Sequence, residues 1–268
     1  EMLNSGVKSF YKYDKGKKLY YDINSKEHKE IPGTKGLIIL DAFKATNIVW
    51  KNEGTTLYDV GEGVLNLEFH TKMNTMGAEV IEGINKAISI AEKNYKGLVI
   101  GNEGDNFSAG ANLGMLFMFA GNREYDKINL SVKAFQNTIM RARYSSVPVV
   151  VATSGLTLGG GTELAMHADH VRAHTETYMG LVEFGVGIIP SGGGTKEMTL
   201  RTSDMYKKGD PELNVLMENF MTIATAKVAT SSKEAVEMGL LRNTDKHTLN
   251  KATLLSKAKK DISYISFF

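Results

Sequence analysis

A short apolar run followed by clustered glycines constrains the fold most. Val147–Ala152 does not alternate between apolar and polar residues, which is typical of a strand buried on both faces, and Gly155–Gly161 follows it. Leu98–Ile100 is a second run of the same kind. Apolar residues recur at helical spacing over 75–94 and again from Ile128 to Ile139, so a helix is predicted before each strand. This alternation predicts an α/β fold with parallel strands.

The first part of the chain has a different composition. Residues 1–45 are polar and rich in Lys and Tyr, and we interpret them as a linker with local β-structure, the remnant of an upstream domain. Turn residues then separate three short predicted strands in the manner of hairpins. These strands are Asn47–Lys51, Thr55–Val60 and Gly63–Phe69.

A helical C-terminal region is predicted over 213–268, after a core over 46–212. The apolar stripe from Leu213 to Ile223 has helical spacing, and Ser231–Glu234 has the spacing of a capping box. The apolar tip Ile262–Phe268 is a candidate contact patch.

Composition narrows the class of partner. The chain has 32 Lys and Arg against 30 Asp and Glu, so its net charge of +2 provides no general field for nucleic acid or anionic membranes. The absence of cysteine excludes disulfides, thiolate zinc sites and cysteine nucleophiles. No apolar run has the length of a membrane-spanning helix, and the N-terminus lacks a secretory pattern. We therefore expect a cytoplasmic protein without membrane insertion; because residue 1 is Glu1, we interpret the chain as a piece of a longer polypeptide.

Three segments carry candidate chemistry. In Asn106–Leu113, small residues would let the backbone approach a ligand with its N–H groups free, although a tight strand-to-helix turn is the simpler explanation of this segment taken alone. In Gly155–Ala165, three glycines lead into a predicted helix, whose N-terminus favours developing negative charge. Glu163 would lie in the first turn, either for catalysis or simply because the helix dipole favours a carboxylate there.

The third segment surrounds Glu183, the only charged residue between Glu176 and Lys196. A carboxyl group desolvated among apolar residues and glycines holds its proton more tightly, as a general acid should. The alternative is that Glu183 is exposed on a loop.

Rival motifs are incomplete. Gly185-Val186-Gly187 lacks the third glycine of a dinucleotide fingerprint, and no Gly-Lys-Ser/Thr sequence completes a P-loop. His170 and His174 would share one face of a helix, but a strand through Asp169–Ala173 would break that geometry. Since no acidic ligand pattern flanks them, we predict no metal site.

Taken together, the three segments resemble the crotonase (enoyl-CoA hydratase/isomerase) superfamily in order and spacing. The family pattern has a Phe-x-Ala-Gly-Ala-Asp-like loop, then Gly-x-x-x-Gly-Gly-Gly-x-Glu-Leu, then Glu-x-x-x-Gly-x-x-Pro-x-x-Gly-Gly. This chain offers Phe107–Leu113, Gly155–Leu164 and Glu183–Gly194, and the resemblance covers roughly residues 55–245. It implies a (ββα)n spiral core, so the core over 46–212 is expected to be crotonase-like.

A narrower resemblance is to the hydratase part of bacterial multifunctional fatty-acid oxidation proteins, which join it to an NAD-dependent 3-hydroxyacyl-CoA dehydrogenase. Asn112, where stand-alone hydratases usually carry Asp, fits that subgroup, as does Gly101–Gly104. The resemblance implies that NAD would serve only an upstream dehydrogenase domain and that this chain holds no cofactor. It also implies an acyl-CoA thioester as the substrate, and either a homo-oligomer or contact with the linked dehydrogenase.

The resemblance assigns roles to individual residues. Ala109 and Gly160 match the positions whose N–H groups form the oxyanion hole. Glu163 matches the carboxylate that activates the attacking water, and Glu183 matches the one that exchanges a proton with C2. The neighbouring positions expected to bind substrate are Gly110, Ala111, Asn112 and Gly159.

Two carboxylates favour hydration of trans-2-enoyl-CoA to 3-hydroxyacyl-CoA, because a water and a C2 proton must both be handled. Double-bond isomerisation from Δ3 to Δ2 needs only a proton shuttle, for which Glu183 alone would suffice. A catalytically idle module that binds acyl-CoA is the remaining alternative.

Overall fold

The structure is a computed structural model that describes residues 2, 6–14, 16–44 and 47–265. Its centre is a seven-stranded sheet with strand order β10-β9-β8-β7-β6-β5-β4. β5 pairs antiparallel with both β4 and β6, whereas the pairs from β6 to β10 are parallel. The strands are β4 Ile48–Lys51, β5 Thr55–Asp59, β6 Val64–Phe69, β7 Gly97–Gly101, β8 Val149–Leu158, β9 His170–Gly180 and β10 Lys246–Thr248. The predicted α/β architecture with parallel strands is confirmed.

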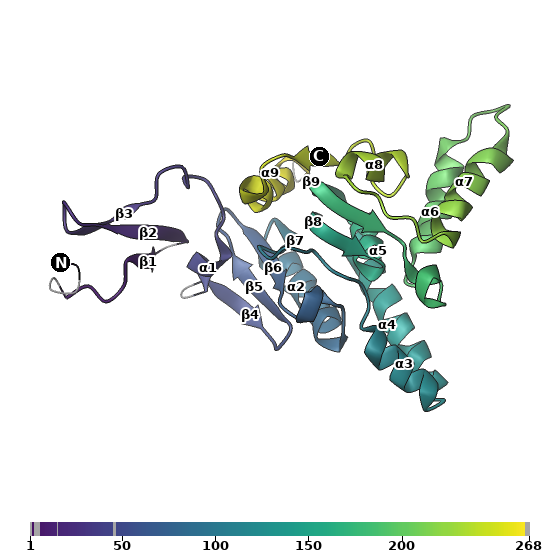
Figure 1. Ribbon diagram of the computed structural model, residues 1–268, viewed down its shortest axis with the longest axis horizontal. Helices are drawn as coiled ribbons and strands as arrows, with labels where there is room; N and C mark the ends of the chain where they lie inside the picture. Colours follow the sequence, from purple (N-terminus) through teal and green to yellow (C-terminus); the bar gives the residue numbers. More distant parts are fainter. Residues whose placement is uncertain (1, 3–5, 15, 45–46, 266–268) are drawn as a thin grey trace.

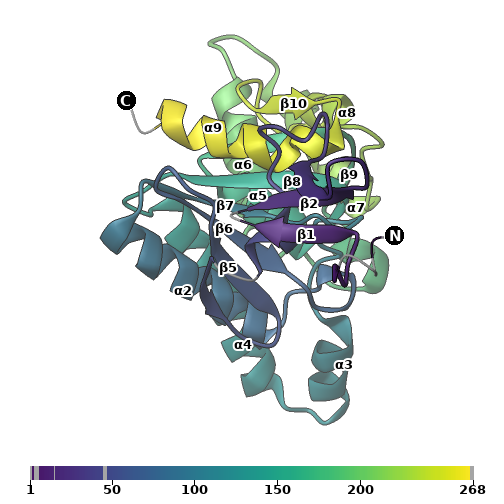
Figure 2. The ribbon, with the colours of Figure 1, turned by 90° about the vertical axis from the view of Figure 1, so that its left-hand side faces the viewer.

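Helices cover both faces of this sheet (Figures 1 and 2). One face packs against α2, α4 and α5, and the other against α9. The α-helices are α1 Leu40–Phe43, α2 Ala78–Asn94, α3 Leu113–Gly121, α4 Tyr125–Arg143, α5 Gly160–His167, α6 Gly194–Met205, α7 Glu212–Ala224, α8 Ser232–Glu237 and α9 Leu254–Ile265. The described residues also form three 3-10 helices: η2 Lys72–Asn74, η3 Glu183–Val186 and η4 Lys251–Thr253.

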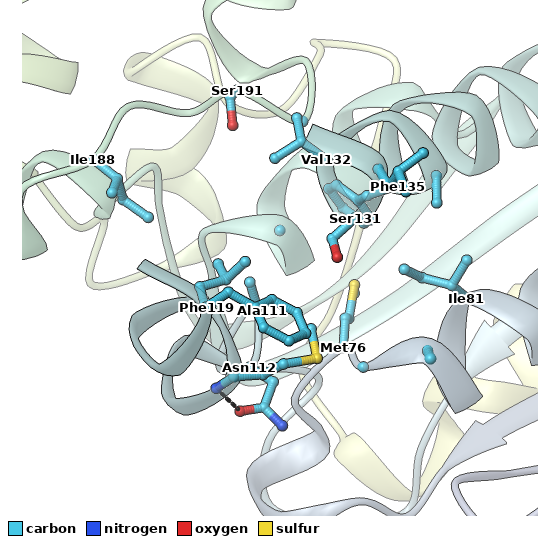
Figure 3. Close-up of a pocket in the computed structure, with 18 of the residues that line it drawn as sticks. Met76, Ile81, Ala111, Asn112, Phe119, Ser131, Val132, Phe135, Ile188 and Ser191 are labelled. Carbon is cyan, nitrogen blue, oxygen red and sulfur yellow. Dashed lines mark hydrogen bonds between the residues drawn. The ribbon is translucent and has the colours of Figure 1, made fainter. Parts of the chain in front are cut away.

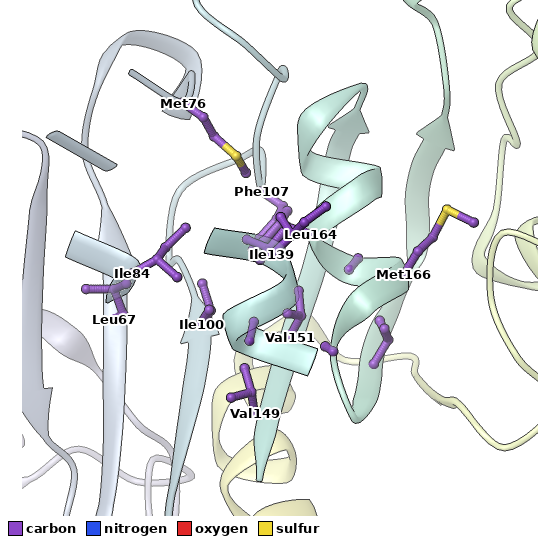
Figure 4. Close-up of a cluster of buried hydrophobic side chains, with 14 of the residues drawn as sticks. Leu67, Met76, Ile84, Ile100, Phe107, Ile139, Val149, Val151, Leu164 and Met166 are labelled. Carbon is purple, nitrogen blue, oxygen red and sulfur yellow. The ribbon is translucent and has the colours of Figure 1, made fainter. Parts of the chain in front are cut away.

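The unalternating strands are buried on both faces, as their composition predicts. In β8, Val149 and Val151 belong to the apolar cluster beneath α2, α4 and α5, whereas Val150 belongs to the cluster beneath α9. Figure 4 shows the first cluster, where Val149 and Val151 lie near Ile139 of α4 and Leu164 of α5. Burial of each such side chain stabilises the fold by about 1.5–3 kcal/mol.

A bend in β8 places the candidate site. The register between β8 and β9 shifts between Thr153 and Gly155, where Gly155 has a φ of 57° and a Cβ would collide with the carbonyl of Asp105. Beyond the bend, Thr157 forms a parallel bridge with Ser108. The loop after β7 therefore lies against the end of β8, where α5 begins.

The strand prediction around the histidines holds, and the helical one is wrong. His170 and His174 both lie in β9, and His170 contacts Asp245 while His174 contacts the carbonyl oxygen of Leu249. Among the described residues, no group of three or more His, Asp or Glu side chains is arranged to hold a metal ion.

The segment interpreted as a linker is partly built into the fold. It forms a separate antiparallel sheet of β1 Tyr11–Asp14, β2 Lys17–Asp22 and β3 Glu27–Glu30, which projects from the body in Figure 1. Ile38 and Leu40, however, are buried in the cluster beneath α9. The expected boundary at residues 45–46 lies outside the described residues.

The C-terminal region contains the expected helices and also β10, which adds to the parallel edge beside β9. Ser231 caps α8 by accepting a hydrogen bond from the Glu234 N–H at 3.2 Å. Ile262 is fully buried in the cluster beneath α9, so this part of the predicted contact patch serves the chain's own core. The end of that patch, residues 266–268, lies outside the described part of the chain.

Candidate active site

Glu163 lies in the first turn of α5, as the glycines before it predict, and its side chain is held by main-chain groups. The residue is 3% exposed, and its Oε1 accepts hydrogen bonds from the N–H groups of Gly193 at 2.9 Å and Gly194 at 2.8 Å. Burial raises the pKa of Glu163, while the N–H groups of Gly192–Gly194 act in the opposite direction. The start of α6 thus stabilises the ionised form of this carboxyl group.

Glu183 begins η3 and has a contrasting environment. Burial, and then the charge of Glu163, raise the pKa of Glu183 to about 8. Its Oε2 is buried and has no hydrogen-bond partner in the part of the chain that the structure describes. A Cβ on Gly159 would lie 3.2 Å from Oε1 of Glu183, so the carboxyl group packs closely on the turn before α5. Of the two alternatives for Glu183, the desolvated one is observed.

The two environments divide the charge between the carboxyl groups. Like charges in a shared site oppose simultaneous ionisation, so one proton is retained by the pair. Glu163 has N–H donors that favour its carboxylate, whereas the buried oxygen of Glu183 has none. The hydrogen bonds therefore favour the carboxylate form at Glu163, whereas burial and the charge of Glu163 favour the protonated form at Glu183.

The amide expected from Ala109 is not available to a ligand. Its N–H donates a 3.1 Å hydrogen bond to the carbonyl oxygen of Met73, which corrects the prediction that Ala109 contributes to the oxyanion hole. Ala111 lies two residues further on, and a Cβ on Gly160 would lie only 3.7 Å from its nitrogen. Neither the Ala111 nor the Gly160 N–H has a hydrogen-bond partner among the described residues. The free pair of amides is therefore Ala111 and Gly160.

Glycine is required at position 110 for this approach. Gly110 has a φ of 95°, and a Cβ there would lie 2.9 Å from the carbonyl oxygen of Leu158 and 3.4 Å from the nitrogen of Gly160. A side chain would push the loop away from α5. Gly110 and Gly159 thus shape the site, whereas Ala111 and Asn112 line it.

A cavity of about 600 Å³ opens in front of these groups. Both carboxyl groups and both free amides contribute to its lining, but most of the wall is apolar. Figure 3 shows Met76, Ile81, Val132 and Phe135 around this space, with Ala111 and Phe119 to the left of Met76. The cavity has the size and the apolar character typical of a ligand-binding pocket.

The helix that forms one side of the cavity was not predicted as a functional element. The side chain of Asn112 caps α3 by accepting a hydrogen bond from the Met115 N–H at 3.3 Å, which Figure 3 marks. Met115, Leu116 and Phe119 of α3 line the cavity. The nearly unbroken apolar composition of 113–120 could have indicated a ligand-binding role. This helix buries none of its residues in the core, so its apolar side chains are left to line the cavity.

Two carboxyl groups in unlike environments and two free amides beside an apolar cavity define a class of site. The arrangement is suited to acid–base chemistry next to a carbonyl group, whose oxygen the amides would stabilise. Residues 59–241 match the family model described as enoyl-CoA hydratase/isomerase. The chain belongs to this family, the crotonase family.

Sequence relatives agree with this assignment. The chain is 43% identical over 261 residues to a "Probable 3-hydroxyacyl-CoA dehydrogenase" of Bacillus subtilis (strain 168), covering 97% of this chain and 32% of that protein. It is 31% identical over 240 residues to a "Putative fatty acid oxidation complex trifunctional enzyme" of Rickettsia felis, covering 89% of this chain and 33% of that protein. The chain therefore spans about a third of the length of these curated relatives.

Solved structures show the same fold. An enoyl-CoA hydratase from Polaromonas sp. JS666 aligns with a TM-score of 0.64 and 24% identity, covering 79% of this chain and 77% of that one. An enoyl-CoA hydratase from Bacillus halodurans aligns with a TM-score of 0.68 and 17% identity, covering 81% of each chain. The predicted crotonase-like core is thus confirmed as a fold. In the described residues, no helix is long and apolar enough to cross a membrane.

Proposed function

We propose that this chain is an enoyl-CoA hydratase module that adds water to trans-2-enoyl-CoA and yields 3-hydroxyacyl-CoA. The observation that carries the proposal is the unequal environment of the two carboxyl groups. Glu163 is stabilised as a carboxylate by the Gly193 and Gly194 amides. Glu183 has a pKa of about 8, so it retains its proton at neutral pH. Addition of water needs one base and one acid at the same time, and this pair supplies both.

The thioester carbonyl would lie between the N–H groups of Ala111 and Gly160. Attack at C3 moves electron density onto the carbonyl oxygen, and two preorganised N–H donors stabilise that charge. Each such donor typically contributes about 10²–10³ in rate. The free amides support this placement, since neither is consumed by the fold.

The two protons would then be handled by different groups. Oε1 of Glu163 is occupied by main-chain N–H groups, which leaves Oε2 to accept a proton from the attacking water. The C3–O bond forms, and Glu183 donates its proton to C2. Water is thus added across the double bond, and exchange with solvent restores both carboxyl groups to their starting states.

The chain would act as one module of a longer fatty-acid oxidation protein. Its Bacillus subtilis relative is named as a 3-hydroxyacyl-CoA dehydrogenase, and the chain spans a third of that protein. The product of hydration is a 3-hydroxyacyl thioester, which is the substrate class of such a dehydrogenase. Any NAD would then be bound by another part of the parent protein. Residues 1–45 would connect the two parts, and residues 46–212 and 213–268 would form the hydratase core and its C-terminal region.

The experiment tests the purified chain for two reactions and for binding without conversion. Incubation with crotonyl-CoA should remove the enone absorbance as 3-hydroxybutyryl-CoA forms. Conversion of a 3-enoyl thioester with no hydration of the 2-enoyl thioester would instead establish the isomerase alternative. Binding of both thioesters without conversion would establish the catalytically idle alternative.

A further inference from the structure

A buried histidine lies directly behind Glu163. The ring of His167, the last residue of α5, has no exposed surface. Its Nδ1 lies 2.7 Å from the carbonyl oxygen of Glu163, and its Nε2 lies 2.8 Å from Nζ of Lys196. A carbonyl oxygen can only accept a hydrogen bond, so Nδ1 carries the proton and Nε2 accepts from the lysine ammonium. The two contacts together select one neutral tautomer.

The same ring contacts the turn that holds the carboxylate. Gly193 has a φ of 148°, and a Cβ there would lie 2.8 Å from Cε1 of His167. The N–H of Gly193 is one of the two donors to Oε1 of Glu163. His167 therefore contacts the main chain of Glu163 through Nδ1. It also packs against Gly193, whose N–H holds the carboxylate of Glu163.

Burial and the neighbouring cations keep the ring neutral. Burial lowers the pKa of His167 to about 4, and the charges of Lys196 and Arg143 also oppose protonation. Glu197 acts in the opposite direction, with Oε2 at 3.9 Å from Nε2, but Arg143 pairs with the same oxygen. Because Glu183 titrates near pH 8, the ring does not change charge in the range where the carboxyl pair does.

We propose that His167, in its Nδ1–H tautomer, is a positioning residue that fixes the direction of the Glu163 carboxylate. This inference rests on the proposed function, in which Glu163 activates the water. The motif that carries the family resemblance ends at Glu163-Leu164, so it gives His167 no role. A small displacement of a catalytic group is costly, because about 1 Å of misplacement can reduce the rate about 10²-fold.

The experiment compares three substitutions at this position. His167→Leu removes both polar contacts and keeps an apolar volume, so kcat for crotonyl-CoA should fall about 10²-fold with little change in KM. His167→Asn keeps an N–H donor near the place of Nδ1, and His167→Gln keeps one near Nε2. The Asn variant should therefore recover most of the lost kcat and the Gln variant should not. His247→Leu, at an exposed histidine of β10, is the matched control and should leave kcat unchanged.

A double-mutant cycle separates positioning from general destabilisation. In a Glu163→Gln background, His167→Leu should reduce the residual kcat by less than about twofold, because the group that it positions is already gone. An equal loss in both backgrounds, or wild-type kcat in the Leu variant, would overturn the inference. If the Leu variant does not fold, the comparison of Asn with Gln decides, and equal kcat in these two variants overturns it.

A second measurement does not depend on turnover. Nitrogen-15 NMR of the histidine rings, with the His167 signals assigned by their loss in His167→Asn, should show Nδ1 protonated and Nε2 unprotonated. The opposite tautomer overturns the inference even if the chain is an active hydratase. The expected tautomer in a chain that does not hydrate crotonyl-CoA rejects the proposed function alone.

Discussion

The two walls of the cavity are built on different principles. Along α5 and α6, Glu163, His167 and Glu197 are at most 3% exposed, and each side chain has hydrogen-bond partners from a neighbouring element. Along α3, no residue belongs to the buried core. Side chains of this helix such as Phe117 and Met118 are more than half exposed.

This difference suggests different roles for the two walls: the α5–α6 wall would hold catalytic groups, and the α3 wall would accommodate the acyl tail of the substrate. A catalytic group must be held close to its productive geometry, which requires a supporting shell of packed and hydrogen-bonded side chains. An apolar tail makes no directional demand, so a wall of Met, Leu and Phe side chains that can adjust is sufficient. We therefore expect substitutions in the α5–α6 wall to change kcat, and substitutions in the α3 wall to change which acyl groups bind well.

The largest effect is expected at the centre of the α5–α6 wall. Glu163→Gln keeps the shape of the side chain and removes its ability to take a proton, so kcat for hydration should fall by about 10³-fold. The measurement is the rate of crotonyl-CoA hydration at saturating substrate, with circular dichroism to verify the fold. Glu237→Gln, at a glutamate whose side chain is 64% exposed, is the control and should leave kcat unchanged. A kcat within tenfold of wild type in Glu163→Gln would break the division between the two walls.

A somewhat smaller effect is expected where the loop meets the start of α5. Gly110→Ala forces a Cβ against the carbonyl oxygen of Leu158, so the amide of Ala111 moves away from that of Gly160. Loss of one donor to the developing charge should lower kcat about 10²-fold. Gly121→Ala, where a Cβ would meet nothing within 4 Å, is the matched control at the end of α3. Equal kcat values for the two variants would show that the close approach at Gly110 has no catalytic role.

The protonated member of the pair predicts a pH dependence of activity and stability. In the proposed mechanism Glu183 donates the proton to C2, and its pKa is about 8, so kcat should fall about tenfold per pH unit above that value. The folded pKa lies above the unfolded value of 4.5, so between these values only the folded state retains the proton. Stability therefore decreases as pH rises from about 4.5 to about 8, and it levels off above pH 8.

Glu183→Gln removes this titration and should be the more stable protein at alkaline pH. At pH 9 its free energy of unfolding in urea should exceed that of wild type by about 1–3 kcal/mol, and the difference should shrink toward pH 4.5. A constant difference between the two proteins across this range would mean that Glu183 is ionised in the folded state.

The motif segments predicted much of this arrangement, because their glycines and strands are local features. The strand, the turn and the helix that carry Glu163 follow directly from the order of apolar residues and glycines. The sequence did not decide the environment of Glu183, since an exposed loop and a desolvated carboxyl group have the same sequence pattern. Only its packing on Gly159 decides between them.

The errors share one physical origin. Ala109 was assigned to the oxyanion hole from the family resemblance, but its N–H donates to the carbonyl oxygen of Met73, which comes from a different segment. The roles of Ala111 and His167 likewise depend on partners that are distant in sequence. Hydrogen-bond partners across the fold decide which amide is free and which tautomer a ring adopts, and no local pattern encodes them.

The smallest effect is expected in the α3 wall, and it tests the other half of the comparison. Phe119 lines the cavity, whereas Phe117 on the same helix does not and is 54% exposed. Phe119→Ala should raise KM for a long-chain 2-enoyl-CoA about three- to tenfold, corresponding to roughly 1 kcal/mol of lost apolar contact, with kcat nearly unchanged. Crotonyl-CoA has too short a tail to depend on this contact, so its KM should stay within about twofold. Phe117→Ala should leave both substrates unaffected. If Phe119→Ala instead lowered kcat for crotonyl-CoA, the α3 wall would also support the chemistry, and the separation between a rigid catalytic wall and an adaptable acyl wall would fail.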